Sequence, residues 1–324
     1  MRTISYVCDQ IALYARLIYT LQYEELIQDP NIDVVYVGSV AQAHASLARR
    51  VLLADKPVVV EKPLTLSFEE SSELVNLARE RNVFMTEGMW TRCFPAMKKI
   101  RRIVLRKDSP IGDVVMVQGD FGWSTDECGP DDRIWNSSSG GGMALDVGMY
   151  LVQMGQIAFP GANVHEVNAV GSLKNGVDHT VAVTIVYKKV DGGTGFLQFY
   201  VTGEANTEER IVIQGTRGRI TMNSPAHVPQ SFKVTVEKER KNVLEHQYDF
   251  PNPDDSFTSW NYPGSIGFTY QIQDVNEALR SGKMELDHYT LNDALQVASI
   301  LDDILGKMQQ GVAATKNSKN TVAM

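Results

Sequence analysis

The stretch Pro57-Val58-Val59-Val60-Glu61-Lys62-Pro63 is the starting point for inferring the fold. Its valines form a short apolar run, which is typical of a strand buried on both faces of a parallel sheet. Two more apolar runs flank it in the sequence, Asp33–Gly38 before it and Val83–Thr86 after it. The three runs predict strands of one sheet.

Segments with helical spacing separate these runs. Residues His44–Ala54 repeat apolar side chains at the spacing of one helix face. Ser67 followed by Glu70 forms a capping box, which predicts a second helix that runs to about Arg81. Because strands and helices alternate, residues 1–110 are predicted to form a Rossmann-type α/β domain with right-handed crossovers.

Strand-like runs dominate the sequence from about Gly112 onward. Turn signals separate several of these eight runs. The runs are Val114–Phe121, Val164–Val170, Thr180–Tyr187, Thr194–Val201, Glu209–Gln214, Arg219–Met222, Phe232–Glu237 and Glu245–Phe250. Helices are predicted near Gly142–Ala158, Thr269–Ser281 and Leu291–Met308. Residues 111–310 therefore predict an α+β domain, a mostly antiparallel sheet with helices on one face. Residues 311–324 are polar and aperiodic, which predicts a disordered tail.

The sequence lacks the usual start of a dinucleotide-binding domain. Such a domain opens with a strand, a G-x-G-x-x-G turn and a helix. No G-x-G-x-x-G occurs in the chain, and Met1–Gln22 lacks a convincing first βαβ unit, which needs about 30 residues. We therefore expect a truncated Rossmann-type sheet that begins mid-domain.

Composition narrows the class of protein. The 324 residues suffice for two domains, and the net charge of -8 with dispersed basic residues argues against a nucleic-acid partner. The three cysteines show no C-x-x-C spacing, so we expect no disulfide framework, no cysteine-based zinc site and a reducing, cytoplasmic location. No apolar run approaches the ~20 residues that span a bilayer, so no membrane partner is expected.

Lys62 follows the Val58–Val60 strand directly. Ligands bind beyond the carboxyl ends of strands in open α/β sheets, so a lysine here can offer a fixed positive charge to a bound ligand. A surface lysine in a turn gives the same tripeptide pattern. Both interpretations stay open on these residues alone.

A second group of candidate residues follows a run of glycines. Gly140-Gly141-Gly142 leads into Met143-Ala144-Leu145-Asp146-Val147-Gly148-Met149-Tyr150. Asp146 and Tyr150 are four residues apart and share one face of a helix. A carboxylate beside a phenol can accept a proton or orient a hydroxyl group, although both residues could also cap and pack a helix end.

Together, E-K-P and, about eighty residues later, G-G-x-x-x-D-x-G-x-Y resemble the Gfo/Idh/MocA oxidoreductase family. The resemblance runs from about Tyr23 to Met308. Several short motifs are similar to its dihydrodiol dehydrogenase branch: Tyr23-Glu24-Glu25-Leu26, Asp29-Pro30-Asn31, Tyr36-Val37-Gly38, Met89-Trp90-Thr91-Arg92 and Phe94-Pro95. Most family members carry histidine where Tyr150 stands, and tyrosine is the form of this branch.

The resemblance implies a function. Members of the branch use NADP to oxidise trans-dihydrodiols of aromatic hydrocarbons, or D-xylose at carbon one. It implies that Lys62 is the active-site lysine, Tyr150 the acid/base and Asp146 a substrate ligand. Tyr150, its pKa lowered from ~10 by a nearby cation such as Lys62, would take the hydroxyl proton while hydride passes to nicotinamide.

The resemblance also suggests further site residues. Trp90 matches an aromatic residue of the substrate pocket, although it could equally be a core tryptophan. Arg133 matches a frequent arginine of the family, although a solvated surface arginine fits the same position. His44 lacks the proline that usually precedes the family's histidine, so it could instead cap or pack. The residues predicted to bind the cofactor are Gly38, His44, Glu61, Lys62 and Pro63.

Two other functions and one partner remain to be weighed. Another sugar or polyol dehydrogenase of the superfamily would be expected to carry histidine at position 150. A non-catalytic ligand-binding relative is favoured by the missing glycine turn and opposed by the presence of Lys62, Asp146 and Tyr150. The run Thr180–Tyr187 is apolar on both alternating faces, which predicts a homodimer through the open face of the sheet, as the resemblance also implies.

We predict that this chain binds NADPH far more weakly than a relative with a glycine turn. The pyrophosphate normally lies on backbone N–H groups at such a turn, and no such turn is encoded here. Calorimetric titration measures the affinity directly. Micromolar or tighter binding would mean that another element replaces the turn.

Overall fold

The structure is a computed structural model that describes residues 3–5, 23–238, 242–252 and 264–322. It contains two compact units. The first consists of Met1–Pro95 and Pro251–Ala298, and the second of Ala96–Phe250 and Ser299–Met324. The first unit thus takes in a segment that lies, in sequence, within the predicted 111–310 domain.

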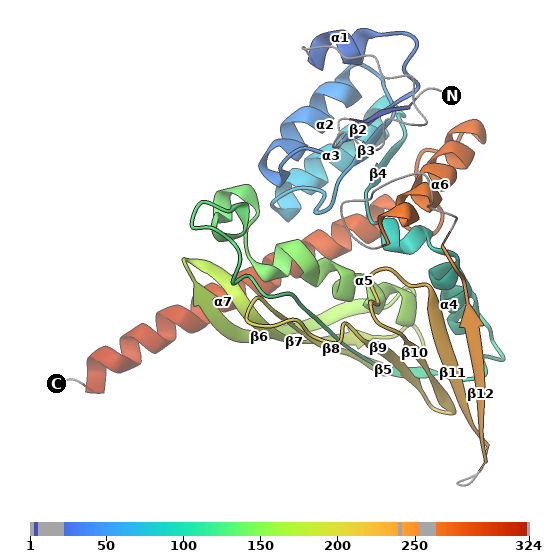
Figure 1. The fold of residues 1–324 in the computed structure, drawn as a ribbon, viewed down its shortest axis with the longest axis vertical. Helices are drawn as coiled ribbons and strands as arrows, with labels where there is room; N and C mark the ends of the chain where they lie inside the picture. Colours follow the sequence, from blue (N-terminus) through green and yellow to red (C-terminus); the bar gives the residue numbers. More distant parts are fainter. Residues whose placement is uncertain (1–2, 6–22, 239–241, 253–263, 323–324) are drawn as a thin grey trace. The chain divides into compact units, whose positions relative to one another are not determined.

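The first unit contains a four-stranded parallel sheet in the order β1-β2-β3-β4 (Figure 1). Its strands are β1 (Thr3–Ser5), β2 (Val34–Val37), β3 (Val58–Val60) and β4 (Met85–Glu87). Central strand β3 is buried along its whole length, as predicted for a strand covered on both faces. The predicted Rossmann-type parallel sheet is confirmed.

Strand β1 lies at one edge of the parallel sheet. It pairs in parallel with β2, Ile4 opposite Val35. Three residues are too short to show the periodicity by which a strand is recognised in a sequence. Residues 6–22, where the rest of a first βαβ unit was sought, lie outside the described residues.

Helices cover both faces of this sheet. Helices α1 (Tyr23–Gln28), α2 (His44–Leu53) and α3 (Phe68–Arg81) alternate with the strands. The predicted capping box is present, since the N–H of Glu70 donates to Ser67 Oγ at 3.2 Å. Helix α6 (Phe268–Arg280) packs Val275 and Ala278 into one core cluster with Val34 on β2, Val59 on β3 and Phe84 just before β4.

The second unit contains an eight-stranded sheet in the order β12-β11-β10-β9-β5-β8-β7-β6. Of its neighbouring pairs, β5 and β8 run parallel and the others antiparallel. The strands are β5 (Val114–Gly122), β6 (Asn163–Lys174), β7 (Val177–Lys188), β8 (Thr194–Thr202), β9 (Ile211–Gly215), β10 (Gly218–Met222), β11 (Ser231–Lys238) and β12 (Asn242–Asp249). The predicted mostly antiparallel sheet is confirmed.

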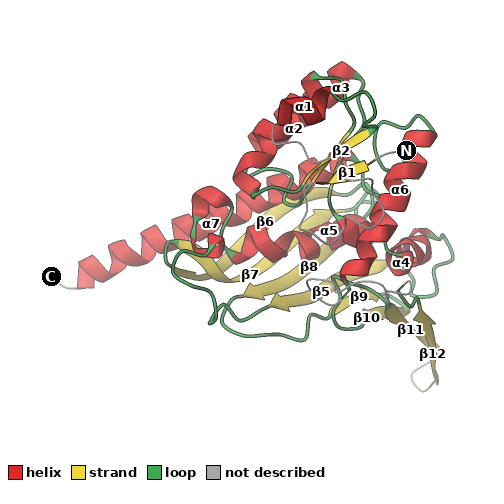
Figure 2. Cartoon of the chain, turned by 45° about the horizontal axis from the view of Figure 1, so that its top comes forward, coloured by secondary structure: helices red, strands yellow, loops and turns green. Residues whose placement is uncertain are grey.

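Helices α4 (Pro95–Leu105), α5 (Met149–Ala158) and α7 (Leu291–Val322) accompany this sheet (Figure 2). Helix α5 lies close against it, because a Cβ atom on Gly155 would lie 2.1 Å from the Tyr187 hydroxyl oxygen. Residues 291–298 of α7 belong to the first unit and the remainder to the second. No helix among the described residues is long and apolar enough to cross a membrane.

Helix α7 is longer than the sequence predicts. The sequence predicts its end near Met308, but the helix continues to Val322. Only Gly311 interrupts this stretch and it contains no proline, so no residue forces the helix to stop. Amphipathic periodicity indicates that one face of a helix is buried. Its absence from residues 311–324 does not by itself stop a helix.

The eight-stranded sheet has one buried face and one open face. In β7 the side chains of Val181, Val183 and Ile185 are buried, whereas Ala182 between them is exposed. On the open face, Ala182 lies in one cross-strand row with Val170 and Tyr200, which are 71% and 44% exposed. Large apolar side chains are therefore left in solvent on this face.

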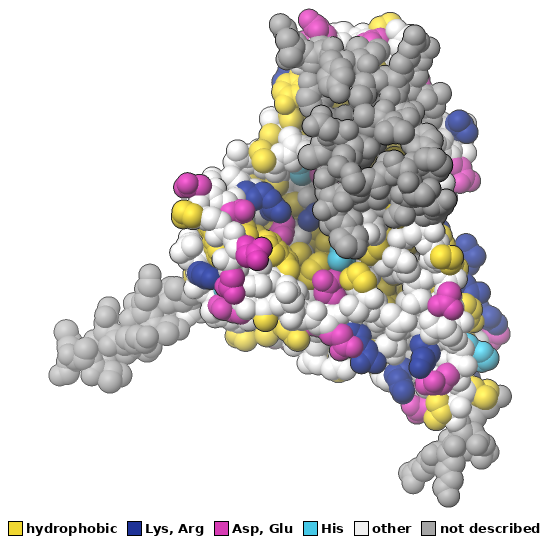
Figure 3. All heavy atoms as spheres, in the orientation of Figure 1, with side chains coloured by type: hydrophobic (Ala, Val, Ile, Leu, Met, Phe, Trp, Pro, Cys, Tyr) yellow, Lys and Arg dark blue, Asp and Glu magenta, His cyan; other side chains and the backbone are white. Residues whose placement is uncertain are grey.

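Charged side chains elsewhere on the second unit are paired across strands. Arg219 and Glu237 approach within 3.3 Å, and Lys233 and Glu245 within 3.2 Å. On the face drawn in Figure 3, acidic and basic side chains are interspersed over this region. Exposed pairs of this kind contribute about 0–1 kcal/mol each.

We predict that the open face of the sheet forms a homodimer. Ala182→Arg should convert the dimer to a monomer, because it places a charge in the centre of the apolar row. Light scattering at micromolar concentration measures the mass. Val190→Arg is the matched control, since Val190 is 81% exposed but lies outside the strands. A wild-type chain that is a clean monomer would contradict the prediction.

Candidate active site

The Glu61-Lys62-Pro63 turn is tied to the neighbouring strand. The Tyr36 hydroxyl on β2 donates to the Glu61 carboxylate, which also accepts the backbone N–H of Lys62 at 3.0 Å. Lys62 is half-buried and precedes a cis peptide bond to the buried Pro63. The turn therefore lies at the carboxyl end of β3, where the sequence placed it, with its backbone fixed.

His44 contacts the backbone of this turn and that of the residues after β2. It is 1% exposed, and its Nδ1 and Nε2 atoms lie 2.8 Å and 3.0 Å from the carbonyl oxygens of Pro63 and Ser39. The imidazole thus links the residues after β2, Gly38 and Ser39, to those after β3. These contacts favour the packing interpretation of His44, and any effect of it on a cofactor would act through Pro63.

A buried carboxyl group lies on the next strand. Glu87, the last residue of β4, is 3% exposed and accepts the N–H of Leu64 at 3.0 Å and the hydroxyl of Tyr289 at 2.6 Å. Burial raises the pKa of Glu87 to about 7, against the opposing effect of these two hydrogen bonds. The charge of Glu61 raises this pKa further and that of Lys62 lowers it.

Glu87 is not among the predicted site residues, although the sequence contains a signal for it. A carboxylate at the end of an apolar strand is rarely buried without a specific partner. The partner, Tyr289, lies 202 positions away in the sequence, so pattern reasoning had no means of finding it.

Trp90 lies in a packed aromatic cluster of the first unit. It is 2% exposed, stacks on Phe268 with ring centroids 4.4 Å apart, and meets the edge of Phe94 at 5.3 Å. These contacts favour the interpretation of Trp90 as a core residue.

In the second unit the glycine run holds Arg133 in place. The N–H groups of Gly142 and Gly141 donate to the carbonyl oxygens of Ile134 and Asn136, at 3.0 Å and 2.8 Å. A Cβ atom on Gly141 would lie 2.5 Å from the Ile134 oxygen, so a larger residue would push this segment away. Arg133 Nη2 lies 2.9 Å from Asp146 Oδ1.

The ion pair joins a mostly exposed cation to a buried anion. The Arg133 side chain is 55% exposed and that of Asp146 is 8% exposed. Arg133 is therefore not merely a solvated surface residue, because its guanidinium group pairs with the carboxylate of the candidate residue Asp146. The pairing fixes the direction of the Asp146 carboxylate.

The helix that carries Asp146 and Tyr150 differs from the prediction. Residues Ala144–Gly148 form a π-helical turn, and α5 begins only at Met149. The Asp178 carboxylate accepts the N–H groups of Ala144, at 2.7 Å, and of Met143, so the start of the turn is fixed from β7. The π-helical turn, which holds more residues per turn than an α-helix, connects this fixed start to α5.

Asp178 is itself enclosed at this helix start. Burial raises its pKa to about 6, and the negative charge of Asp146 adds to the rise. Gly142, with a φ of +104°, passes so close that a Cβ atom would lie 2.1 Å from Asp178 Oδ1. Only glycine fits this position, on both conformational and steric grounds.

Tyr150 is buried between aromatic rings. It is 6% exposed, and its ring centroid lies 5.8 Å from that of Phe121 and 5.5 Å from that of His227. His227 Nδ1 in turn lies 2.6 Å from Glu209 Oε2. A histidine–glutamate pair beside Tyr150 was not predicted, because 77 positions separate the histidine from Tyr150 and no motif marks it.

The structure thus assembles two groups of predicted residues, one in each unit. Asp146, Arg133 and Tyr150 lie together around the start of α5. Gly38, His44 and the Glu61-Lys62-Pro63 turn lie at the carboxyl edge of the parallel sheet, while Trp90 lies in the core after β4.

Comparisons with known proteins place this chain in a family. Residues 7–89 match the family described as "Oxidoreductase family, NAD-binding Rossmann fold", and residues 97–221 match the GFO/IDH/MocA C-terminal domain. The fold agrees with these matches. The chain belongs to the Gfo/Idh/MocA family of oxidoreductases.

Two similar curated proteins carry the same name. A trans-1,2-dihydrobenzene-1,2-diol dehydrogenase of Xenopus tropicalis is 33% identical over 88% of this chain and 81% of its own length. That of Sus scrofa is 31% identical over 87% of this chain and 79% of its own length.

Solved structures share the fold at lower identity. A levoglucosan dehydrogenase in complex with NADH and levoglucosan has a TM-score of 0.74 at 22% identity, covering 90% of this chain and 82% of its own. An aldose-aldose oxidoreductase from Caulobacter crescentus has a TM-score of 0.72 at 20% identity, covering 89% and 81%. A 3-ketoreductase from Actinomadura kijaniata in complex with NADP and TDP-benzene has a TM-score of 0.66 at 23% identity, covering 90% and 81%.

We predict that Glu87 makes the folded chain lose stability as pH rises from about 4.5 to 7. Its pKa is about 7 in the folded chain and 4.5 as the ordinary value, so the folded chain holds the proton more tightly. The stabilisation is complete below the unfolded pKa and is lost as pH rises through the folded one, by roughly 3 kcal/mol.

Urea unfolding at several pH values in this window measures the effect. Glu87→Gln should flatten the pH dependence, whereas Glu73→Gln, at a side chain 66% exposed, should leave it unchanged. The same slope in wild type and Glu87→Gln would show that Glu87 does not hold the proton.

Proposed function

We propose that this chain is an NADP-dependent dehydrogenase that oxidises a hydroxyl group of a trans-dihydrodiol or of an aldose such as D-xylose. The observation that carries the proposal is the arrangement at the start of α5. There a buried Tyr150 follows Asp146 by four residues, and Arg133 pairs with the Asp146 carboxylate at 2.9 Å. The name of the curated relatives, trans-1,2-dihydrobenzene-1,2-diol dehydrogenase, supports the diol.

The first unit fits a nicotinamide dinucleotide at the carboxyl edge of its parallel sheet. Gly38 after β2 and the Glu61-Lys62-Pro63 turn after β3 lie at this edge, with the turn backbone held by His44. Ligands of open α/β sheets bind at this edge. The cofactor, when bound, would accept the hydride. The choice of NADP over NAD rests on the resemblance to the dihydrodiol dehydrogenase branch.

Tyr150 is proposed to exchange the proton. Oxidation of a CH–OH group to a carbonyl releases one proton from the oxygen and one hydride from the carbon. The phenol of Tyr150 is the group that we assign to the proton, as general base in oxidation and general acid in reduction.

Asp146 and Lys62 are proposed to hold the substrate and balance its charge. The Asp146 carboxylate, oriented by Arg133, would accept a hydrogen bond from a second hydroxyl of the diol or sugar. The ammonium group of Lys62 would stabilise negative charge that develops on the substrate oxygen. The rings of Phe121 and His227 beside Tyr150 suit a flat aromatic diol or a sugar ring.

A non-catalytic ligand-binding relative is the second candidate. The absence of G-x-G-x-x-G from the sequence favours it, because weak cofactor binding would leave the site without a hydride acceptor. Activity of the wild-type chain separates the two proposals.

We predict that Tyr150→Phe lowers turnover of D-xylose or a trans-dihydrodiol by about 10²–10⁴-fold, the usual contribution of general acid–base catalysis. The substitution removes only the phenolic oxygen, so packing should survive. Lys62→Met should lower turnover as well, while neither change should alter NADPH affinity as strongly. Reduction of NADP, followed spectroscopically, measures the rates.

Matched controls lie on the β11–β12 pair. Tyr248→Phe and Lys233→Met make the same chemical changes on two strands that carry no proposed site residue. If Tyr150→Phe and Lys62→Met stay within a few-fold of wild type, the assigned residues are wrong. If wild type reduces no NADP with any sugar or diol, the non-catalytic proposal is favoured.

A further inference from the structure

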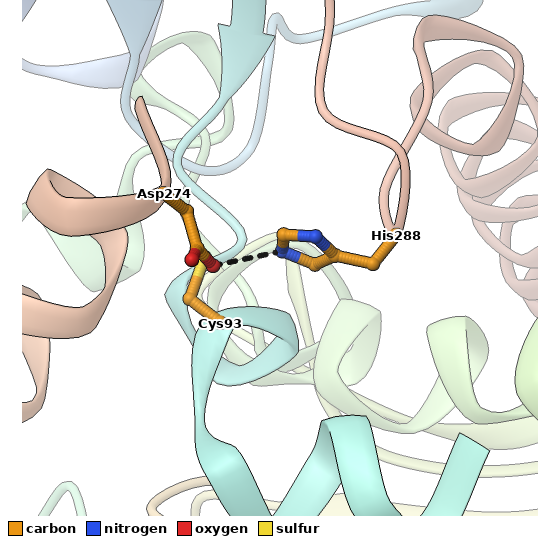
Figure 4. Close-up of side chains that lie close together, drawn as sticks. All are labelled: Cys93, Asp274 and His288. Atoms are coloured by element: carbon orange, nitrogen blue, oxygen red, sulfur yellow. Dashed lines mark ion pairs between the residues drawn. The ribbon is translucent and has the colours of Figure 1, made fainter. Parts of the chain in front are cut away.

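Three side chains with metal-binding atoms meet inside the first unit, away from the Lys62 turn. They are Cys93, the last residue of the 3₁₀ turn Trp90–Cys93, Asp274 on α6, and His288 in the segment before α7. Figure 4 shows the three side chains converging from separate parts of the chain. One ligand atom from each lies within 4.8 Å of the other two.

All three side chains are shielded from solvent. Cys93 is 1% exposed, and the side chains of Asp274 and His288 are 11% and 16% exposed. His288 Nε2 points at Asp274 Oδ2 across 3.2 Å, yet Nε2 makes no hydrogen bond of acceptable geometry within the described part of the chain. The imidazole is therefore aimed at the centre of the cluster without being satisfied there by a hydrogen bond.

A bound cation would neutralise the charges of these shielded side chains. Cys93 belongs to the apolar core cluster that contains Phe84 and Val275. Buried charges need compensation, which a nearby ion of opposite sign can provide. A thiolate and a carboxylate carry two negative charges and a neutral imidazole none, so one divalent cation gives a neutral cluster.

We propose that Cys93, Asp274 and His288 bind a zinc ion. One sulfur, one nitrogen and one oxygen ligand suit zinc, whereas calcium and magnesium prefer oxygen alone. Zinc–ligand bonds of about 2.0–2.3 Å in a tetrahedron separate the ligand atoms by about 3.3–3.6 Å. The 3.2 Å between His288 Nε2 and Asp274 Oδ2 is close to this separation. A water molecule would complete four-fold coordination.

The zinc ion would hold together segments that support the Lys62 turn. Arg92, beside Cys93, donates to the His288 carbonyl oxygen at 3.1 Å, and its guanidinium lies 5.1 Å from the centre of the Tyr289 ring. Tyr289 donates to Glu87, which accepts the N–H of Leu64 just after the turn. The site is structural in this proposal, and it is independent of the substrate proposed above.

No pattern in the sequence indicates this site. The sequence predicts no cysteine-based zinc site, because metal motifs are recognised by short ligand spacings. Here 181 positions separate Cys93 from Asp274, and 14 more separate Asp274 from His288. Only the packing of α6 and the segment before α7 onto the first 95 residues brings the ligands together.

The test uses the full chain, stripped with a chelator and then titrated with zinc or cobalt. We expect about one zinc ion per chain by elemental analysis after gel filtration, and a thermal midpoint several degrees higher with zinc than without. Cobalt in the site should give a thiolate-to-metal charge-transfer band. Cys93→Ser and His288→Gln should each abolish the band and the zinc-dependent shift.

Matched controls separate this site from adventitious surface binding. Cys128→Ser and His165→Gln make the same changes in the second unit, and both should keep the band and the shift. A wild-type chain without the cobalt band, or retention of zinc by folded Cys93→Ser and His288→Gln, overturns the proposal. If these two variants do not fold, the proposal is tested by the cobalt band of the wild-type chain and by the loss of the zinc-dependent shift in Asp274→Asn.

Discussion

The buried carboxyl group of Glu87 is the interaction on which the first unit depends. It joins the N–H of Leu64, just beyond the Lys62 turn, to the hydroxyl of Tyr289, in the segment between α6 and α7. A carboxyl group without these partners would be costly to bury, and even with them its pKa rises to about 7. The position of the predicted active-site lysine is therefore coupled to a segment more than 200 residues further along the chain.

An analogous constraint organises the second unit. Asp178 on β7 accepts N–H groups at the start of the π turn, and Gly142 passes so close to it that no side chain fits. The neighbouring Gly141 keeps the Arg133 segment near, so that Arg133 can pair with Asp146. The glycine run thus serves the site through close packing of backbone, and the two buried carboxyl groups, Glu87 and Asp178, play similar roles in the two units.

The sequence predicts correctly those elements whose physical cause lies in residues close together in the chain. The apolar runs gave the parallel strands, and the capping box at Ser67 gave the start of α3. Strand β1, the end of α7 and the π turn were not predicted. Strand β1 depends on pairing with β2, the end of α7 on uninterrupted helix propensity, and the π turn on the distant Asp178 carboxylate. Among candidate site residues, Asp146 and Arg133 are in contact, whereas His44 and Trp90 are packed in the core.

The class of fold, the family resemblance and the candidates Lys62, Asp146 and Tyr150 could all be inferred from the sequence, because each inference uses spacings within one or two elements. Other features emerge only in the folded chain: the contact of Glu87 with Leu64 after the turn, the pair of His227 and Glu209 beside Tyr150, and the separate cluster of Cys93, Asp274 and His288. The physical reason is the same in each case. Burial and pairing of polar groups depend on contacts between residues far apart in the chain, which no local periodicity encodes.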